Sequence, residues 1–253
     1  MSQSRVIYLV AGASRGIGLA LVEEIAARDA SAIIYAGARD PSAPLLKEVT
    51  EKYHGRVVVV KYVAGDKEGN DAIAKEIGAK YGRVDTVIAN AGIFNCLSKV
   101  HETPILKFVE HFDVNAIGPI VLFQSIRELL KASPSPRFVP ISSGAGSIER
   151  IPISALEVAP YGTSKAALNW ITRKIHFENE WLVAFPQCPG PVDTDMAKQA
   201  KALDNAEVVE LIKKLKLRSS GEVAKILIDI ITASTREKDG GQFHNIDGGR
   251  HPW

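Results

Sequence analysis

Short apolar segments alternate with longer amphipathic segments along the whole chain, and this alternation constrains the fold more than any other feature. The apolar segments are rich in β-branched residues, as expected of strands buried on both faces of a sheet. The predicted strands are Val6–Ala11, Ala32–Ala38, Arg56–Val63, Val84–Ala89, Arg137–Ser142, Trp181–Cys188 and Gln242–Ile246. The predicted helices are Ile17–Arg28, Pro44–Tyr53, Lys67–Tyr81, Ile105–Lys131, Ala159–Glu180 and Gly221–Ala233. Because strands and helices alternate, we predict a doubly wound parallel sheet of about seven strands, with helices on both faces.

Length and composition narrow the class of protein. A chain of 253 residues with 46% hydrophobic residues suits a single domain spanning 1–253, and no segment resembles a linker. The net charge is only +2 and the basic residues are dispersed, which argues against nucleic-acid binding. The two cysteines and six histidines show no convergent spacing for a metal. The first apolar run is too short to span a membrane and lacks a signal-peptide layout, so we expect a cytoplasmic protein without membrane contact.

A glycine-rich turn follows the first predicted strand. It reads Ala11-Gly12-Ala13-Ser14-Arg15-Gly16-Ile17-Gly18, and its Gly-x-x-x-Gly-x-Gly spacing differs from the Gly-x-Gly-x-x-Gly fingerprint. Such a turn lets the backbone and a helix N-terminus approach a pyrophosphate, which indicates a dinucleotide site in a Rossmann-type fold. A tight strand–helix turn that merely needs glycine is the alternative explanation.

Two arginines in and near this turn indicate which dinucleotide the site binds. Arg15 lies within it, and Arg39 follows the second predicted strand, where an NAD site usually has an acidic residue for the ribose. Two guanidinium groups suit the 2′-phosphate of NADP(H), which we therefore expect as cofactor. Asp40, one position further on, weakens this prediction, and two solvated arginines remain the alternative.

A candidate acid/base pair begins the fifth predicted helix. Tyr161 and Lys165 are four residues apart, so both side chains share one helix face. We expect the ammonium to lower the pKa of the phenol towards the range useful for proton transfer. Ser142 and Ser143 close the preceding strand, where a hydroxyl could bind a carbonyl oxygen.

Asn115 interrupts a long helical pattern. Asparagine followed by Gly118 and Pro119 is locally unfavourable within a helix, which indicates a functional distortion of the helix. A helix end near Gly118 is the alternative.

In this order the motifs resemble the short-chain dehydrogenase/reductase family over essentially the whole chain, and they are similar to fungal ketoreductases labelled norsolorinic acid ketoreductase. The resemblance implies that Asn115, Ser143, Tyr161 and Lys165 form a catalytic tetrad, with Ser142 the weaker choice of serine. It also implies a cofactor site, whose members are Gly12, Ser14, Arg15, Gly16, Ile17, Gly18, Arg39, Asn90, Ala91, Gly92, Tyr161, Lys165, Pro189, Gly190, Val192 and Thr194. By this resemblance Tyr161 donates a proton to a carbonyl oxygen while NADPH delivers hydride to carbon. Asn115 would support a proton-relay water.

The chain departs from the family pattern at several points. Ser143 lies 18 positions before Tyr161, about five more than is common, and this should reshape the substrate pocket. We expect substrate loops around 143–160 and 189–215. Val63 replaces a common aspartate near the adenine, so Val63–Asp66 is only a tentative adenine site. Ala11 stands where threonine is usual, and the extra Pro191 should stiffen the start of the second loop.

The substrate and the assembly are the least defined features. The resemblance implies a ketone or other carbonyl, and apolar residues suited to a bulky, aromatic substrate are Phe94, Ile148, Ile151, Ile153, Leu156 and Met196. These residues also suit ordinary loop anchors. An oxidative alcohol dehydrogenase and a non-catalytic NADP(H) sensor are the alternative functions. Relatives imply a homodimer or homotetramer, and the predicted helix Ile105–Lys131 has more apolar positions than one core face needs, including Val121, Leu122, Phe123 and Ile126. The tail Arg250–Trp253 is expected to cover the chain's own pocket or a neighbour's.

Overall fold

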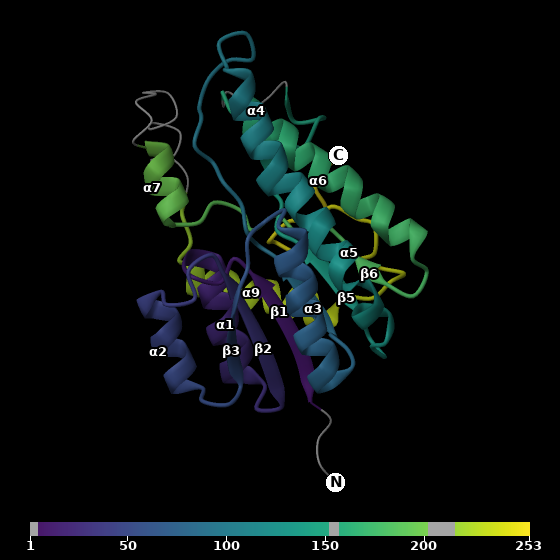
Figure 1. Ribbon diagram of the computed structural model, residues 1–253. Coiled ribbons are helices and arrows are strands. Elements are labelled where there is room, and N and C mark those ends of the chain that lie inside the picture. The colour runs from purple at the N-terminus through teal and green to yellow at the C-terminus, as the bar shows by residue number, and fades with distance from the viewer. Residues whose placement is uncertain (1–4, 152–156, 202–215) are drawn as a thin grey trace.

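The computed structural model describes residues 5–151, 157–201 and 216–253, and its centre is a parallel β-sheet (Figure 1). The strands are β1 Val6–Ala11, β2 Ala32–Ala38, β3 Val57–Lys61, β4 Thr86–Ala89, β5 Arg137–Pro140 and β6 Val183–Ala184. Their order is β3-β2-β1-β4-β5-β6, and every neighbouring pair is parallel. The order reverses between β1 and β4, which confirms the doubly wound sheet and places the ligand-binding crevice at the carboxyl ends of these strands.

Helices cover both faces of the sheet. They are α1 Gly16–Arg28, α2 Pro44–Lys52, α3 Lys67–Tyr81, α4 Ile105–Phe112, α5 Gly118–Lys131, α6 Ala159–Glu178, α7 Asp195–Lys201 and α9 Ser220–Ala233. The core on one face includes residues of α1, α2 and α9, and the core on the other face includes residues of α3, α5 and α6. None of the helices within the described ranges has the length and apolar character needed to cross a membrane.

The central strand β1 shows why the sequence forms a buried sheet. Tyr8 and Val10 pack into the α1/α2/α9 core, whereas Ile7, Leu9 and Ala11 pack into the α3/α5/α6 core. Successive side chains of a strand point to opposite faces, so a strand covered on both sides needs apolar residues at every position.

The prediction of a seventh strand at Gln242–Ile246 is only partly met. Within this segment, His244 forms an isolated parallel bridge with Gln187. The Cys188 N–H donates to the His244 carbonyl at 2.8 Å, and the His244 N–H donates to the Pro186 carbonyl at 3.0 Å. Pro186 has no N–H to donate to the last segment, which limits the pairing there to an isolated bridge and leaves this segment as an extended edge.

The predicted helix Ile105–Lys131 contains a π-helical segment at Asp113–Ile117, between α4 and α5. The expected distortion at Asn115 is therefore confirmed. The alternative of a helix end is wrong, because Gly118 stays helical at φ −52° and ψ −53°. Pro119 has no N–H for the carbonyl four residues earlier, which is that of Asn115, and a wider turn absorbs this missing bond.

Candidate active site

The glycine-rich turn joins β1 to α1 beneath the crevice. The N–H groups of Gly12 and Ala13 donate to the carbonyl of Gly37 in β2 at 2.9 and 2.8 Å, which fixes the turn to the sheet. Gly12 has φ +87°, and a Cβ on Gly18 would lie 2.0 Å from the Gly12 carbonyl oxygen. The turn is therefore a backbone cradle that larger residues would fill, as a pyrophosphate site at a helix N-terminus requires.

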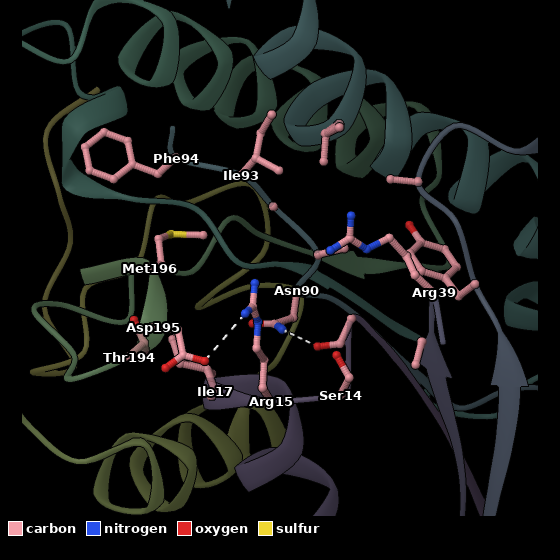
Figure 2. Close-up of a pocket in the computed structure, with 18 of the residues that line it drawn as sticks. Ser14, Arg15, Ile17, Arg39, Asn90, Ile93, Phe94, Thr194, Asp195 and Met196 are labelled. Carbon is pink, nitrogen blue, oxygen red and sulfur yellow. Dashed lines mark hydrogen bonds and ion pairs between the residues drawn. The ribbon is translucent and has the colours of Figure 1, made fainter. Parts of the chain in front are cut away.

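A cavity of about 500 Å³ opens above this turn (Figure 2). It is lined by Gly12, Ser14, Arg15, Gly16, Ile17, Ala38, Arg39, Tyr62, Val63, Ala64, Asn90, Ala91, Gly92, Ile93, Phe94, Asn95, Val114, Thr194, Asp195 and Met196. The lining comes from segments that follow β1, β2, β3, β4 and β6, at the carboxyl ends of the strands. Cavity and turn together fit a dinucleotide.

Both predicted arginines line this cavity. Arg15 forms an ion pair with Asp195 at 3.5 Å, and both side chains remain about half exposed (Figure 2). Asp40 is not among the lining residues, because its carboxylate accepts hydrogen bonds from the N–H and the hydroxyl of Ser42 at 2.9 and 2.6 Å. These bonds lower the pKa of Asp40 and direct its carboxylate into the turn before α2. The cavity thus presents guanidinium groups where an NAD site presents a carboxylate.

Asn90 and Gly92 connect the glycine turn to the predicted catalytic residues. The Asn90 side-chain amide donates to the Gly12 carbonyl at 2.8 Å, a bond visible in Figure 2. A Cβ on Gly92 would lie 3.1 Å from the Asn115 Oδ1 atom and 3.7 Å from the Lys165 Nζ atom. Asn115 and Lys165 therefore lie directly behind the cavity wall at Gly92.

Tyr161 and Lys165 occupy successive turns of α6, as predicted. The Lys165 Nζ atom lies 5.7 Å from the centre of the Tyr161 ring and donates to the Ile141 carbonyl at 2.8 Å. Burial lowers the pKa of Lys165 to about 8, because the charged form is removed from water. The Tyr161 ring contacts the Phe94 ring, which lines the cavity, with centroids 4.8 Å apart.

The expectation that Lys165 lowers the pKa of Tyr161 is wrong for this structure. Burial raises the pKa of Tyr161 to about 12, and a hydrogen bond with Ser143 opposes this only in part. The ammonium lies over the ring and bonds to the Ile141 carbonyl, so desolvation of the phenolate dominates.

The structure separates the two candidate serines. Ser143 caps a short 3-10 turn at Gly144–Gly146, where its hydroxyl accepts from the Ala145 N–H at 3.2 Å, and it also hydrogen-bonds to Tyr161. Ser142 is 2% exposed, and its hydroxyl donates to the Asn169 Oδ1 atom at 2.5 Å. The geometry therefore brings Ser143 to the tyrosine, whereas Ser142 belongs to the core.

Asn115 is completely buried in the π-helical segment. Its amide nitrogen donates to the Ile93 carbonyl and the Ser164 hydroxyl, both at 3.0 Å, and its Oδ1 atom accepts from the Ile93 N–H at 2.8 Å. The Ser164 hydroxyl in turn donates to the Tyr161 carbonyl at 2.7 Å. Both amide hydrogens are thus used within the protein, and Asn115 ties the loop after β4 to the turn of α6 that carries Tyr161.

The segment after β6 contributes less of the cavity than predicted. Thr194 lines it, but Pro189, Gly190 and Val192 do not, and Val192 is 8% exposed within the core. A Cβ on Gly16 would lie 3.5 Å from the Thr194 methyl group, which places Thr194 over the glycine turn. Met196, further along, lines the same end of the cavity as Phe94 (Figure 2).

The first substrate loop packs against the tail of the same chain. The Glu149 N–H donates to the Trp253 carbonyl at 2.8 Å, and Arg150 Nη1 lies 3.2 Å from His251 Nδ1. Arg173 of α6 lies 4.6 Å from the centre of the Trp253 ring. The tail therefore packs on the first substrate loop and on α6 of its own chain, and none of its residues lines the cavity.

Only some of the candidate substrate residues can be placed. Phe94 and Met196 line the cavity, whereas Ile148 and Ile151 are 67% and 63% exposed. Ile153 and Leu156 lie outside the described residues, as does the second substrate loop from 202 to 215.

Several cavity residues were not predicted from the sequence, namely Ala38, Tyr62, Ile93, Asn95, Val114 and Asp195. Each lies within three positions of a predicted residue or segment. Their position next to these motifs is the feature of the sequence that could have identified them. In the part of the chain that the structure describes, no group of three or more His, Cys, Asp or Glu side chains is arranged to hold a metal.

The doubly wound sheet, the glycine turn, the cavity and the Tyr161–Lys165 pair define a dinucleotide-dependent oxidoreductase of the α/β class. The sequence model of the family described as short chain dehydrogenase matches residues 6–205. The chain belongs to this family.

Known proteins support the assignment. An uncharacterized oxidoreductase of Schizosaccharomyces pombe is 31% identical over 261 residues, covering 100% of each chain. A norsolorinic acid ketoreductase of Emericella nidulans is 31% identical over 257 residues, covering 100% of this chain and 95% of the relative. An NADPH-bound carbonyl reductase from chicken fatty liver has a similar structure, with a TM-score of 0.84, 25% identity and coverage of 98% and 100% of the two chains.

Proposed function

We propose that this chain is a single-domain, NADPH-dependent ketoreductase that reduces a bulky, aromatic ketone to an alcohol. One observation carries the proposal: a single cavity has Arg15, Arg39 and Phe94 in its lining, and the Phe94 ring contacts Tyr161, which hydrogen-bonds to Ser143. The arginines favour a phosphorylated cofactor, and the hydroxyl pair suits a carbonyl oxygen.

The chain's own residues divide the work of holding the cofactor. The glycine turn would bind the pyrophosphate, and the two guanidinium groups would bind the 2′-phosphate. Val63 and Ala64 line the cavity and would contact the adenine, whereas the Asp66 carboxylate instead caps α3 by accepting from the Gly69 N–H at 3.0 Å. Lys165 would bind the ribose, and the Pro189–Thr194 segment would hold the carboxamide. When bound, NADPH supplies the hydride.

The proton is held by Tyr161. Ser143 would orient the substrate oxygen by a hydrogen bond, and the Tyr161 hydroxyl would give that oxygen its proton. Asn115 supports Tyr161 through Ser164, which bonds to the Tyr161 carbonyl, and it also fixes Ile93 next to Phe94.

The raised pKa of Tyr161 suits a proton donor. Burial raises the pKa of Tyr161, so the phenol holds its proton at neutral pH and can donate it to a substrate oxygen. Burial beside the Phe94 ring is the physical cause. An alcohol dehydrogenase that works oxidatively would use the same residues, because the ratio of reduced to oxidised cofactor decides the direction.

The substrate class follows from relatives and from the cavity wall. Several relatives are named norsolorinic acid ketoreductase. In this chain Phe94 and Met196 both line the same end of the cavity, and apolar side chains of this kind suit a flat ring system (Figure 2).

Tyr161→Phe tests the chemistry. We expect kcat for NADPH oxidation with an aromatic diketone or quinone to fall by about 10³-fold or more, while the Kd for NADPH stays within about twofold. Tyr53→Phe, at the half-buried residue that follows α2 and does not line the cavity, is the matched control and should retain full activity. Full activity in Tyr161→Phe would overturn the mechanism.

Arg39→Asp tests the cofactor. We expect the preference for NADPH over NADH, measured as the ratio of kcat/KM values, to fall by at least about tenfold, because a carboxylate repels the 2′-phosphate. An unchanged ratio would refute the proposal for NADP(H).

We also propose a homodimer or homotetramer, but not through the residues first considered. Leu122, Phe123 and Ile126 lie in the core at 1%, 7% and 1% exposure, so they are not a surplus surface. Exposed apolar side chains occur instead on α4 and α6, at Ile105, Leu106, Val109, Phe112, Trp170 and Phe177. Light scattering after size exclusion should give two or four times 27.4 kDa, and a monomer at micromolar concentration would refute this.

A further inference from the structure

The loop after β4 carries the aromatic wall of the cavity. Ile93, Phe94 and Asn95 all line the cavity, and the Phe94 ring meets the Tyr161 ring at an interplanar angle of 54°. This loop has no regular secondary structure, so contacts from neighbouring elements must fix its position.

Two side chains one helical turn apart hold the backbone on either side of Phe94. Asn115 bonds to both the N–H and the carbonyl of Ile93. His111, four positions earlier at the end of α4, accepts from the Asn95 N–H through its Nε2 atom at 3.5 Å. Phe94 is therefore held from the residue before it and from the residue after it.

His111 is set up to act as an acceptor. Its Nδ1 atom lies 2.7 Å from the Lys107 carbonyl, which can only accept, so Nδ1 carries the hydrogen and Nε2 carries the lone pair. The residue is completely buried, and burial lowers its pKa, which favours this neutral form. Its ring meets the Tyr161 ring edge-on, with centroids 6.5 Å apart.

We propose that His111 is a positioning residue that fixes the Phe94 ring against Tyr161 and thereby sets how large carbonyl substrates enter. The inference rests on the proposed reductase function, and it adds a specificity role that the predicted tetrad does not contain. His111 is too deeply buried to touch the substrate, so it acts through the Asn95 backbone and Phe94.

Two isosteric substitutions separate the two bonds of the imidazole. The amide of an asparagine reaches the position of Nδ1, so His111→Asn keeps the bond to the Lys107 carbonyl and loses the bond to Asn95. The amide of a glutamine reaches the position of Nε2, so His111→Gln can still accept from Asn95. Loss of general stability would affect both variants, whereas loss of positioning affects His111→Asn alone.

Kinetics supply the first measurement. With NADPH and 9,10-phenanthrenequinone, we expect His111→Asn to raise KM by about tenfold and to change kcat by less than threefold, whereas His111→Gln stays near wild type. With the small ketone butane-2,3-dione, neither variant should change KM by more than about twofold. In a Phe94→Ala background, His111→Asn should have no further effect, because the two residues act in series. Equal KM values for His111→Asn and His111→Gln with 9,10-phenanthrenequinone would overturn the inference. Additive effects of His111→Asn and Phe94→Ala on this KM would also overturn it.

Hydrogen exchange supplies a measurement that needs no activity. We expect the Asn95 amide to exchange at least about tenfold faster in His111→Asn than in wild type or His111→Gln. Unchanged exchange would overturn the inference. If the wild-type protein reduces none of the carbonyls, the proposed function fails, and the exchange rates alone then decide whether His111 holds the loop.

Discussion

Replacing Lys165 with methionine should make the protein more stable at neutral pH while abolishing its activity. Lys165 is 4% exposed, and burial lowers its pKa from the usual 10.5 to about 8. Each pKa unit corresponds to about 1.4 kcal/mol, so holding the charge in the folded state costs about 3 kcal/mol at pH 7. Methionine fills similar space without charge, but it gives up the bond to the Ile141 carbonyl, a loss of about 1–2 kcal/mol. The net gain expected is about 1–2 kcal/mol.

The pH dependence isolates the charge from the packing. Between pH 8 and 10.5 the unfolded chain binds the Lys165 proton more tightly than the folded chain, so wild-type stability rises with pH in this window. Relative to Lys165→Met, the wild type should gain about 2 kcal/mol between pH 7 and pH 9.5. The raised pKa of Tyr161, about 12, acts with the opposite sign, but only above pH 10.

Urea unfolding at pH 7 and pH 9.5, followed by tryptophan fluorescence, measures both quantities. Lys174→Met is the matched control, because Lys174 lies on the same helix with its side chain 54% exposed, and its stability should follow the wild type at both pH values. If the wild type and Lys165→Met change stability in parallel with pH, the buried charge is not the cause and the reasoning fails.

Three further predictions concern the loops around the cavity. Ser143→Ala should lower kcat by about 10²-fold without loss of stability. Ser142→Ala should retain activity, and its free energy of unfolding in urea should fall by about 1–2 kcal/mol. The reverse pattern would show that Ser142 is the catalytic serine. Gly18→Ala places a methyl group 2.0 Å from a carbonyl oxygen of the glycine turn, so NADPH binding measured by fluorescence should weaken by at least about tenfold, and an unchanged Kd would refute the cradle. Trp253→Ala should speed proteolysis between 147 and 151, whereas Trp170→Ala, an exposed residue of α6, should not; equal cleavage rates would show that the tail does not support the loop.

Local patterns in the sequence predicted most of the fold. Continuous apolar strands such as β1 and β2 are confirmed because each position faces one of two cores. The same reasoning failed at Gln242–Ile246, where Pro186 on the neighbouring segment prevents a ladder. The properties of that neighbour are not visible in the pattern of the segment itself.

The candidate site was likewise predicted only in part. The order of motifs predicted which residues the fold would bring near the cavity, and Gly12, Arg39 and Thr194 lie there. It did not predict the pKa of Tyr161, because that depends on how deeply the phenol is buried and where the Lys165 ammonium points. It also missed His111, since a histidine on an apolar helix gives no sign in sequence of the backbone amide it will accept from.

The π-helical segment at Asp113–Ile117 makes this stretch sensitive to insertions and deletions as well as to substitution of Asn115. A π turn accommodates one residue more than an α turn, so losing a single codon here would restore an uninterrupted α-helix. Everything that follows would then rotate by about 100° and shift by about 1.5 Å relative to α4. Leu122 and Ile126 would leave the core together, and Asn115 would turn away from Ile93. Homologous sequences that align here without a gap therefore share this extra residue, and natural length variation should be confined to the loops on either side.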